Sequence, residues 1–247
     1  RQPPSFPFGG MENPRLTFAT PTIIAGDRSL VSLIAHELAH SWSGNLVTNA
    51  TWNDFWLNEG FTVYFERRIM EALYGKDYTD MLALLGFQDL TSELSSLDED
   101  MQKLKLKLNG LHPDDAMSDI AYEKGYFFLR MLEEKKGRAK MDSFLKNYFD
   151  DHKFQTITTE EFLAYLDQNL LQGEEDGLMI NQWVYQSGLP ANCPKVLSNR
   201  FVQAEKAVDV FLKKGVDNIV DAAADWSTHE WLHSVSYTHL TLPTKQM

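Results

Sequence analysis

The chain has 247 residues, of which 35 are acidic and 23 basic, so its formal net charge is −12. This balance argues against a nucleic-acid partner, which needs clustered lysine and arginine. Hydrophobic residues make up 43% of the chain and aromatic residues 12%, which supports a packed core and argues against global disorder. No apolar run reaches the roughly 18 residues of a membrane span, so we expect none. The single cysteine, Cys193, favours a reducing, cytoplasmic compartment.

Residues 2–7 contain three prolines, and the chain starts without a methionine. We interpret this stretch as a connector and expect the natural N-terminus to lie upstream of it. Two adjacent glycines, Gly9 and Gly10, then allow a backbone to approach a ligand closely, and Glu12 follows them. Residues 15–20 alternate in character between two prolines, which predicts a short edge strand.

The segment from Ser29 to Trp42 is the most informative part of the chain. Its apolar residues recur with a helical period, at Leu30, Leu33, Ile34, Leu38 and Trp42. On such a helix His36 and His40 lie one turn apart, with about 5–6 Å between their Cβ atoms, which suits two imidazoles that bind one metal ion at about 2.0–2.1 Å. Glu37 is rotated by roughly 100° and can reach a metal-bound water without being a ligand. The pattern is typical of zinc peptidases.

A second helix is expected from Asn53 or Asp54 to about Tyr74, and it carries Glu59 in its first turns. Two histidines and one glutamate would form a catalytic zinc site with its fourth position left for water. Glu66 lies seven residues further on, on the same helical face. It is either a partner that orients a ligand or a solvated carboxylate, and the sequence leaves both interpretations open.

The remaining chain predicts further helices and few chemical motifs. Residues 104–108 alternate like a strand, and we expect them at the surface. The run Thr158-Thr159-Glu160-Glu161 resembles a capped helix start. Helices are expected over 77–97, 126–132, 142–148, 162–170, 180–189 and 201–214, with residues 192–194 as a linker.

The motif Gly9-Gly10-Met11-Glu12-Asn13, followed by His36-Glu37-x-x-His40 and Glu59, closely resembles the aminopeptidase N-like family of zinc metallopeptidases, a gluzincin family. Residues 3–8, 41–49 and 187–190 are similar to its leukotriene A(4) hydrolase / aminopeptidase B branch. The resemblance extends over about residues 2–233. Residues 234–247 instead resemble translated adapter sequence, and we expect them to be a non-native tail.

The resemblance implies a fold that is mainly α with a small β-sheet, in the α+β class. Residues 1–190 would be a thermolysin-like catalytic domain without the N-terminal β domain of the family. Residues 191–233 would be a linker and the first helices of a truncated C-terminal helical domain. The chain would then be a fragment that contacts the missing domains in its parent protein.

The resemblance also implies roles for individual residues. Glu12 would bind the free α-amino group of a peptide, and Tyr122 would donate a hydrogen bond to the oxyanion. The second tyrosine of leukotriene A(4) hydrolase, five residues earlier, is replaced here by Met117, which argues against epoxide hydrolysis. Substrate contacts are implied for Gly9, Gly10, Met11, Glu12 and Asp114.

We therefore expect a zinc aminopeptidase that acts on peptides with a free N-terminal amine. One Zn²⁺ per chain would be held by His36, His40 and Glu59, with Glu37 as general base. Three alternatives remain open: a thermolysin-like endopeptidase, a bifunctional aminopeptidase and epoxide hydrolase, and an inactive fragment that acts only as a binding or scaffold protein.

Overall fold

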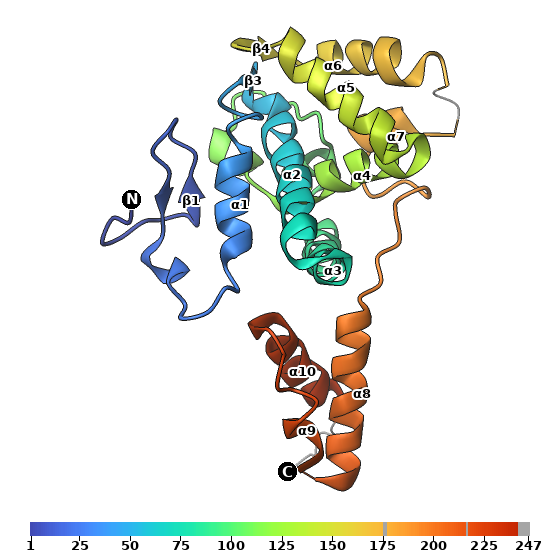
Figure 1. Cartoon of the computed structure of the whole chain (residues 1–247). Coiled ribbons are helices and arrows are strands. Elements are labelled where there is room, and N and C mark those ends of the chain that lie inside the picture. The colour runs from blue at the N-terminus through green and yellow to red at the C-terminus, as the bar shows by residue number, and fades with distance from the viewer. Residues whose placement is uncertain (175–176, 216, 242–247) are drawn as a thin grey trace.

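A computed structural model describes residues 1–174, 177–215 and 217–241 of the chain (Figure 1). Most of these residues are helical, and the strands form two small sheets, which confirms the expected α+β class. The helices are α1 Val31–Ala39, α2 Trp56–Tyr74, α3 Lys76–Leu94, α4 Gly125–Lys136, α5 Arg138–Asp151, α6 Thr159–Leu166, α7 Ile180–Tyr185, α8 Asn199–Lys214, α9 Asp217–Val220 and α10 Thr228–Thr241. The strands are β1 Gly10–Met11, β2 Phe18–Ala19, β3 Val47–Asn49 and β4 Gln155–Ile157.

Helix α2 is the centre of the main core. Residues on most sides of its first two turns are buried, because α1, α3 and α4 pack around it (Figure 1). Trp56 and Phe61 are fully buried and contact the aromatic rings of Phe128 and Phe162 edge-on. Burying a large aromatic side chain contributes about 1.5–3 kcal/mol, so this cluster fixes α2 and the residues that α2 carries.

The two glycines Gly60 and Gly125 allow α2 to approach α4 at backbone distance. A Cβ atom on Gly60 would lie 2.8 Å from the Cα of Gly125 and 3.2 Å from the carbonyl oxygen of Ala121. Any larger residue at either position would push the helices apart. A π-helix, Ile120–Lys124, precedes α4 at this contact.

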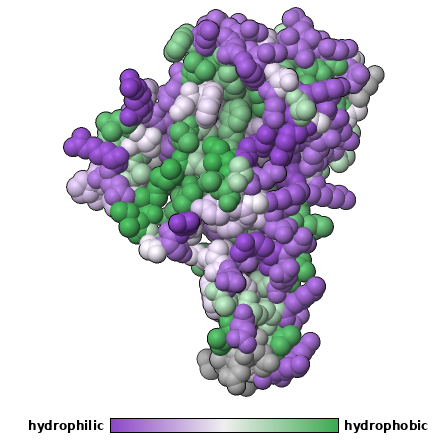
Figure 2. All heavy atoms as spheres, in the orientation of Figure 1, coloured by the Kyte–Doolittle hydropathy of each residue, from purple (hydrophilic) through white to green (hydrophobic). Residues whose placement is uncertain are grey.

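Helix α1 has the predicted helical period, but its apolar stripe does not face the core. Ile34, Leu38 and Trp42 are 49%, 54% and 44% exposed, respectively. The buried residues of α1 are instead Ala35, Glu37 and Ala39, and the side chain of Glu37 lies against Gly10 of the hairpin. Hydrophobic side chains accordingly gather on the surface over α1 (Figure 2). The buried positions of α1 therefore combine two alanines with one glutamate.

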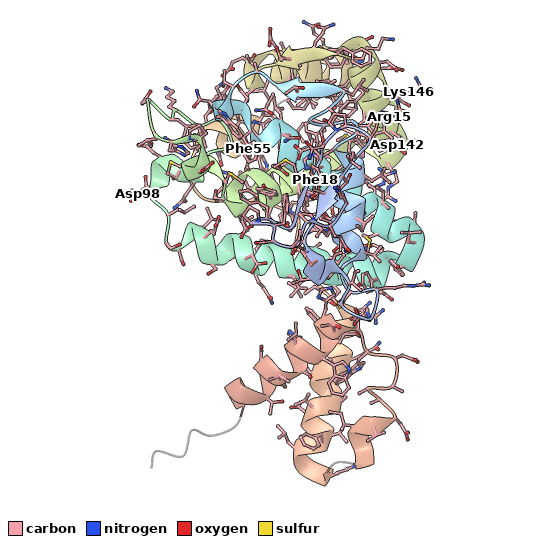
Figure 3. The ribbon with its side chains drawn as sticks, turned by 90° about the vertical axis from the view of Figure 1, so that its left-hand side faces the viewer. Arg15, Phe18, Phe55, Asp98, Asp142 and Lys146 are labelled. Atoms are coloured by element: carbon pink, nitrogen blue, oxygen red, sulfur yellow. The ribbon has the colours of Figure 1, made fainter. Side chains whose placement is uncertain are left out.

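The two sheets are small and join distant segments. Strands β1 and β2 pair antiparallel, with Gly10 opposite Ala19, so the strand expected over residues 15–20 is shorter than predicted. This hairpin lies beside α1. Figure 3 views the molecule from the side of the hairpin and labels Phe18 of β2. Strands β3 and β4 pair in parallel. Residues 104–108 form no strand, and their leucines are buried rather than at the surface.

The C-terminal helices α8, α9 and α10 form the lower part of the molecule in Figure 1. Phe201 on α8 is buried with Met70, Tyr78 and Met81, so α8 is attached to α2 and α3. Helix α10 continues to Thr241, so the first part of the expected non-native tail is helical. Residues 242–247 of the expected tail lie outside the described residues. In the described part of the chain, no helix is long and apolar enough to cross a membrane.

Candidate metal centre and active site

Three side-chain atoms from α1 and α2 converge at one point. The Nε2 atoms of His36 and His40 lie 3.2 Å apart, and Oε2 of Glu59 lies 3.2 Å from the first and 3.6 Å from the second. Ligands bound at about 2.0–2.1 Å around a tetrahedral zinc ion lie about 3.3 Å from one another. The three predicted ligands therefore already have the spacing of one face of a zinc tetrahedron.

Two further observations show that these residues fit a metal ion. Oε2 of Glu59 is buried and has no hydrogen-bond partner among the described residues, although a buried carboxylate oxygen without a partner is costly. Burial lowers the pKa of His36, but the neighbouring carboxylates of Glu59 and Glu66 outweigh burial and raise this pKa to about 10. The cluster thus favours a positive charge at this place.

The outer nitrogen atoms of both histidines are held by other residues. Nδ1 of His36 lies 3.2 Å from Oε2 of Glu66, which favours the orienting interpretation left open for Glu66. Nδ1 of His40 lies 3.0 Å from the carbonyl oxygen of Ser43 and 3.0 Å from Oδ1 of Asn58. With Nδ1 donating to these oxygens, each Nε2 is the nitrogen that would bind a metal ion at the common point, in place of any proton it carries.

Glu37 lies next to the ligand cluster with a largely desolvated carboxylate. A Cβ atom on Gly10 would overlap with this carboxylate, so the hairpin can approach Glu37 only because residue 10 is glycine. Burial raises the pKa of Glu37, and the positive charge of His36 opposes this effect. The negative charges of Glu12 and Glu59 also raise the pKa, which becomes about 7. A carboxyl group with a pKa near neutrality is suited to general acid–base catalysis.

Tyr122 reaches the cluster from the π-helix. Its ring stacks on that of His36, with 6.2 Å between centroids and 17° between planes, and meets Phe55 edge-on at 6.0 Å. Burial raises the pKa of the phenol, and the carboxylates of Glu59, Glu12 and Glu37 raise it further. The hydroxyl therefore stays protonated near neutral pH and can donate a hydrogen bond.

All predicted site residues line one cleft of 880 Å³, which also contains Phe55 and Met117. Oε1 of Glu12 lies 4.0 Å from Nδ1 of His40, and the backbone carbonyl of Glu12 accepts a hydrogen bond from Asn45. Asp114 lies at the rim, where its side chain is 73% exposed and pairs with His112. The members predicted from the sequence are Gly9, Gly10, Met11, Glu12, His36, Glu37, His40, Glu59, Asp114 and Tyr122.

The sequence did not predict the partners of His40. Asn58 precedes the ligand Glu59 in the chain, and Thr62 lies one helical turn after Asn58, so both face α1. Thr62 Oγ1 lies 3.0 Å from Nδ1 of His40 and 2.7 Å from Oγ of Ser43. The spacing of Asn58 and Thr62 on α2 was the available signal, because residues four apart share a helical face.

The model of the peptidase family M1 domain matches residues 2–183. The chain belongs to peptidase family M1. Leucine aminopeptidase 2 of Neosartorya fischeri is 47% identical over 195 residues, and the leukotriene A-4 hydrolase homolog of Botryotinia fuckeliana is 46% identical over 196 residues. Both alignments cover 76% of this chain but only 32% and 30% of the relatives, so the chain spans about a third of their length.

Solved structures of the family have the same fold. Native leukotriene A4 hydrolase from Saccharomyces cerevisiae superposes with a TM-score of 0.85 at 36% identity, covering 98% of this chain and 41% of that one. An M1 zinc metallopeptidase from Deinococcus radiodurans gives a TM-score of 0.61 at 26% identity, covering 79% of this chain and 40% of that one. The expected membership of the aminopeptidase N-like gluzincins is confirmed.

Proposed function

We propose that this chain carries the catalytic centre of a zinc aminopeptidase, which removes N-terminal residues from peptides. The observation that carries the proposal is the convergence of His36, His40 and Glu59 in the same cleft as Glu37 and Tyr122. The names of the relatives, leucine aminopeptidase and zinc metallopeptidase, support the same reaction class.

The three ligand atoms would hold one Zn²⁺ per chain. When bound, the ion supplies Lewis-acid polarisation of the scissile carbonyl and lowers the pKa of a bound water toward about 7. Glu66, Asn58 and Ser43 keep the two imidazoles in the required orientation, because they fix the outer Nδ1 atoms. The protein thus supplies a preformed set of ligands, and zinc does not have to order them.

Glu37 is the proposed general base. Its carboxylate takes a proton from the attacking water and passes it to the leaving amine. Oε2 of Glu37 is buried and has no hydrogen-bond partner among the residues described, so it is free to accept that proton. Tyr122 donates its hydroxyl proton in a hydrogen bond to the negative charge that develops on the carbonyl oxygen.

Glu12 is the proposed anchor for the substrate amine. Its carboxylate lies at the ligand cluster, where an ammonium group would form a charge-assisted hydrogen bond in a partly desolvated site. A peptide bond in the middle of a chain offers no such charge, so the contact selects N-terminal residues. Gly9, Gly10, Met11 and Asp114 would line the path of the bound peptide.

We also propose the division of the chain at about residue 190 into a catalytic domain and the start of a helical domain. The helix-free stretch between α7 and α8 supports this boundary. Contacts with further domains of a longer parent protein, and a cytoplasmic location, belong to the same proposal. Met117 at the cleft wall, in place of a tyrosine, disfavours epoxide hydrolysis as a second activity.

Hydrolysis of a panel of aminoacyl arylamides by the wild-type chain and by Glu37→Gln tests the proposal. The wild type should release the arylamine from free-amine substrates and not from their N-acetylated counterparts. The Glu37→Gln variant should keep its zinc and lose turnover. Equal cleavage of the N-acetylated peptides would instead support an endopeptidase, and zinc binding without any turnover would support a binding protein.

A further inference from the structure

Three consecutive residues of the π-helix contact three different parts of the molecule. Tyr122 faces the cleft, Glu123 contacts Arg67 on α2, and Lys124 contacts two backbone carbonyls. The π geometry is shown by the N–H of Gly125, which bonds to the carbonyl of Ile120 five residues earlier. Such turns are rare and are found most often at functional sites.

The hydroxyl of Tyr122 has no hydrogen-bond partner within the described part of the chain. Its ring has neighbours in His36 and Phe55, but both contacts are aromatic and do not hold the oxygen atom. The position of the hydroxyl therefore depends on where the backbone of the π-helix lies. Whatever fixes that backbone also fixes the distance from the hydroxyl to the metal centre.

Glu123 and Arg67 form a buried, two-point ion pair. Arg67 Nη2 donates to Oε1 of Glu123 at 2.8 Å, and Nη1 donates to Oε2 at 3.2 Å. The residues are 8% and 7% exposed. The guanidinium lies 4.5 Å from the ring centroid of Tyr126, and the carboxylate occupies the space that a Cβ atom on Gly86 would fill. The ion pair is thus buried between the ring of Tyr126 and the backbone of α3 at Gly86.

The ion pair connects the two elements that build the site. Arg67 follows Glu66 directly on α2 and lies two turns after the ligand Glu59. Glu123 follows Tyr122 directly on the π-helix. Along the chain, Glu123 is therefore one residue from Tyr122. Arg67 is connected to Glu59 by two turns of the same helix.

Lys124 provides a second anchor for the same turn. Its fully buried ammonium donates to the carbonyl of Gln102 at 2.7 Å and to that of Gln186 at 2.8 Å. Gln102 in turn accepts a hydrogen bond from the N–H of Gly188 at 3.0 Å. Lys124 thus holds the π-helix to two loops, whereas Glu123 holds it to α2. The contact of Glu123, together with the close approach of Gly60 to Ala121 and Gly125, holds the π-helix to the helix that carries Glu59.

We propose that Arg67 and Glu123 are positioning residues for Tyr122. Their ion pair fixes the π-helix against α2 so that the Tyr122 hydroxyl points to the metal centre. Neither residue touches the substrate or a metal ligand, and both act through the tyrosine. The proposal rests on the proposed function. A buried ion pair is weak evidence for stability alone, because an apolar pair of similar volume is often as stable; positioning gives this pair a role.

The test compares Glu123→Gln and Arg67→Lys with the matched control Arg68→Lys. Arg68 is the neighbouring arginine on α2, but it pairs with Glu133 and Asp142, outside the π-helix. In arylamide hydrolysis, both test variants should lower kcat by about 10–100-fold with KM nearly unchanged, because misplacement by about 1 Å costs that much. Arg68→Lys should leave kcat within about twofold.

The background variant Tyr122→Phe separates positioning from general damage. If Glu123 acts through the hydroxyl of Tyr122, Glu123→Gln should cause no further loss of kcat once that hydroxyl is absent. A loss of the same size in both backgrounds would overturn the proposal. If the single variants do not fold, the double replacement Arg67→Met with Glu123→Met keeps the volume without leaving a buried charge unpaired, and it should show the same loss of kcat.

A second measurement needs no turnover. The ring carbon and proton NMR signals of Tyr122, assigned by their absence in Tyr122→Phe, are sensitive to the ring currents of His36 and Phe55. They should shift in Glu123→Gln and Arg67→Lys and stay in place in Arg68→Lys. Unchanged signals in folded test variants would overturn the positioning role. A wild-type chain without turnover would contradict the proposed function, while the NMR comparison would still decide this inference.

Discussion

The molecule buries glutamates in two opposite ways. Glu230 on α10 is 4% exposed, and its two oxygens accept hydrogen bonds from Arg200 and from the backbone and hydroxyl of Ser227. Glu37 is 7% exposed, yet one of its oxygens has no hydrogen-bond partner among the described residues. Hydrogen bonds and charge hold the pKa of Glu230 below its usual value against burial, whereas burial raises that of Glu37.

The difference separates structural from chemical carboxylates. A buried carboxylate with all its partners connects two elements, here α8 and α10, and its removal costs stability. A buried carboxylate without partners costs stability and is retained for a task. Glu59 is of the second kind, since its Oε2 also has no hydrogen-bond partner among those residues. A third such oxygen, Oε2 of Glu93, lies on α3 outside the cleft, whereas those of Glu37 and Glu59 lie together in the cleft beside the two histidines.

The largest effect is expected for Glu37→Gln. The amide has nearly the same shape as the carboxylate but cannot accept the proton, so kcat should fall by about 10²–10⁴-fold. Zinc content, measured by atomic emission, should stay at one per chain, since Glu37 lies outside the proposed ligand set. A variant that keeps more than a tenth of the wild-type kcat would contradict the role of Glu37.

Tyr122→Phe should have the next largest effect. Removing a hydrogen-bond donor to an oxyanion typically costs about 10²–10³ in kcat. The ring contacts with His36 and Phe55 are kept, so the unfolding midpoint should stay the same. Stopped assays at saturating substrate measure kcat directly. Wild-type kcat in the variant would exclude the hydroxyl from the mechanism.

Glu66→Gln should act on the metal and not on the chemistry. The residue bonds to Nδ1 of His36, and loss of such an outer partner typically weakens zinc binding by about 10–100-fold. Competition with a chelating dye measures this affinity. The matched control is Glu71→Gln, because Glu71 lies on the same helix but pairs with Arg138 away from the cleft. Equal affinities of both variants would show that Glu66 does not orient His36.

The smallest effect is expected in how the free energy of unfolding changes with pH, which should differ between the two kinds of carboxylate. Urea unfolding of the metal-free chain measures it. The pKa of Glu37 is raised to about 7 in the folded chain, so the folded state binds more protons between about pH 4.5 and 7, and stability falls as pH rises through that range. In Glu37→Gln this decline, on the order of 3 kcal/mol, should be absent.

Glu230 should behave in the opposite sense. Its pKa is lowered in the folded chain, so its contribution is complete above the unfolded value and is lost as pH falls through the folded value. Glu230→Gln should therefore remove stability near neutral pH and reduce the loss of stability on acidification. The same slope in both variants would remove the distinction drawn between Glu37 and Glu230.

Much of the site could be predicted from the sequence, because its spacing reflects helical geometry. The pair His36 and His40 is local to one helix, and Glu59 follows on the next, so their convergence required only that the two helices pack. The hydrogen bonds around His40 could not be predicted, since they come from Ser43, Asn58 and Thr62. Those contacts depend on the rotation of α2 against α1, which the periodicity of either helix alone does not determine.

Tertiary packing also decided the parts of the fold that were predicted incorrectly. Helix α1 has the predicted period, but the residues it buries are Ala35, Glu37 and Ala39 and not those of its apolar stripe. Residues 104–108 alternate like a strand, yet the N–H groups of Lys105 and Leu106 bond to the carbonyls of Val184 and Asn53, and no ladder forms. The hydrophobic period of residues 104–108 thus indicated that one face is buried, but it did not indicate which segments this face packs against.

Zinc titration of the metal-free chain, with His40→Ala as the ligand variant and His152→Ala as the control, tests the account most directly. His152 is hydrogen-bonded to Tyr148 far from the ligand cluster and should be dispensable for metal binding. We expect one tightly bound zinc ion per chain in the wild type and in His152→Ala, and none in His40→Ala. Zinc bound equally well by all three, or by none, would contradict a metal centre at His36, His40 and Glu59.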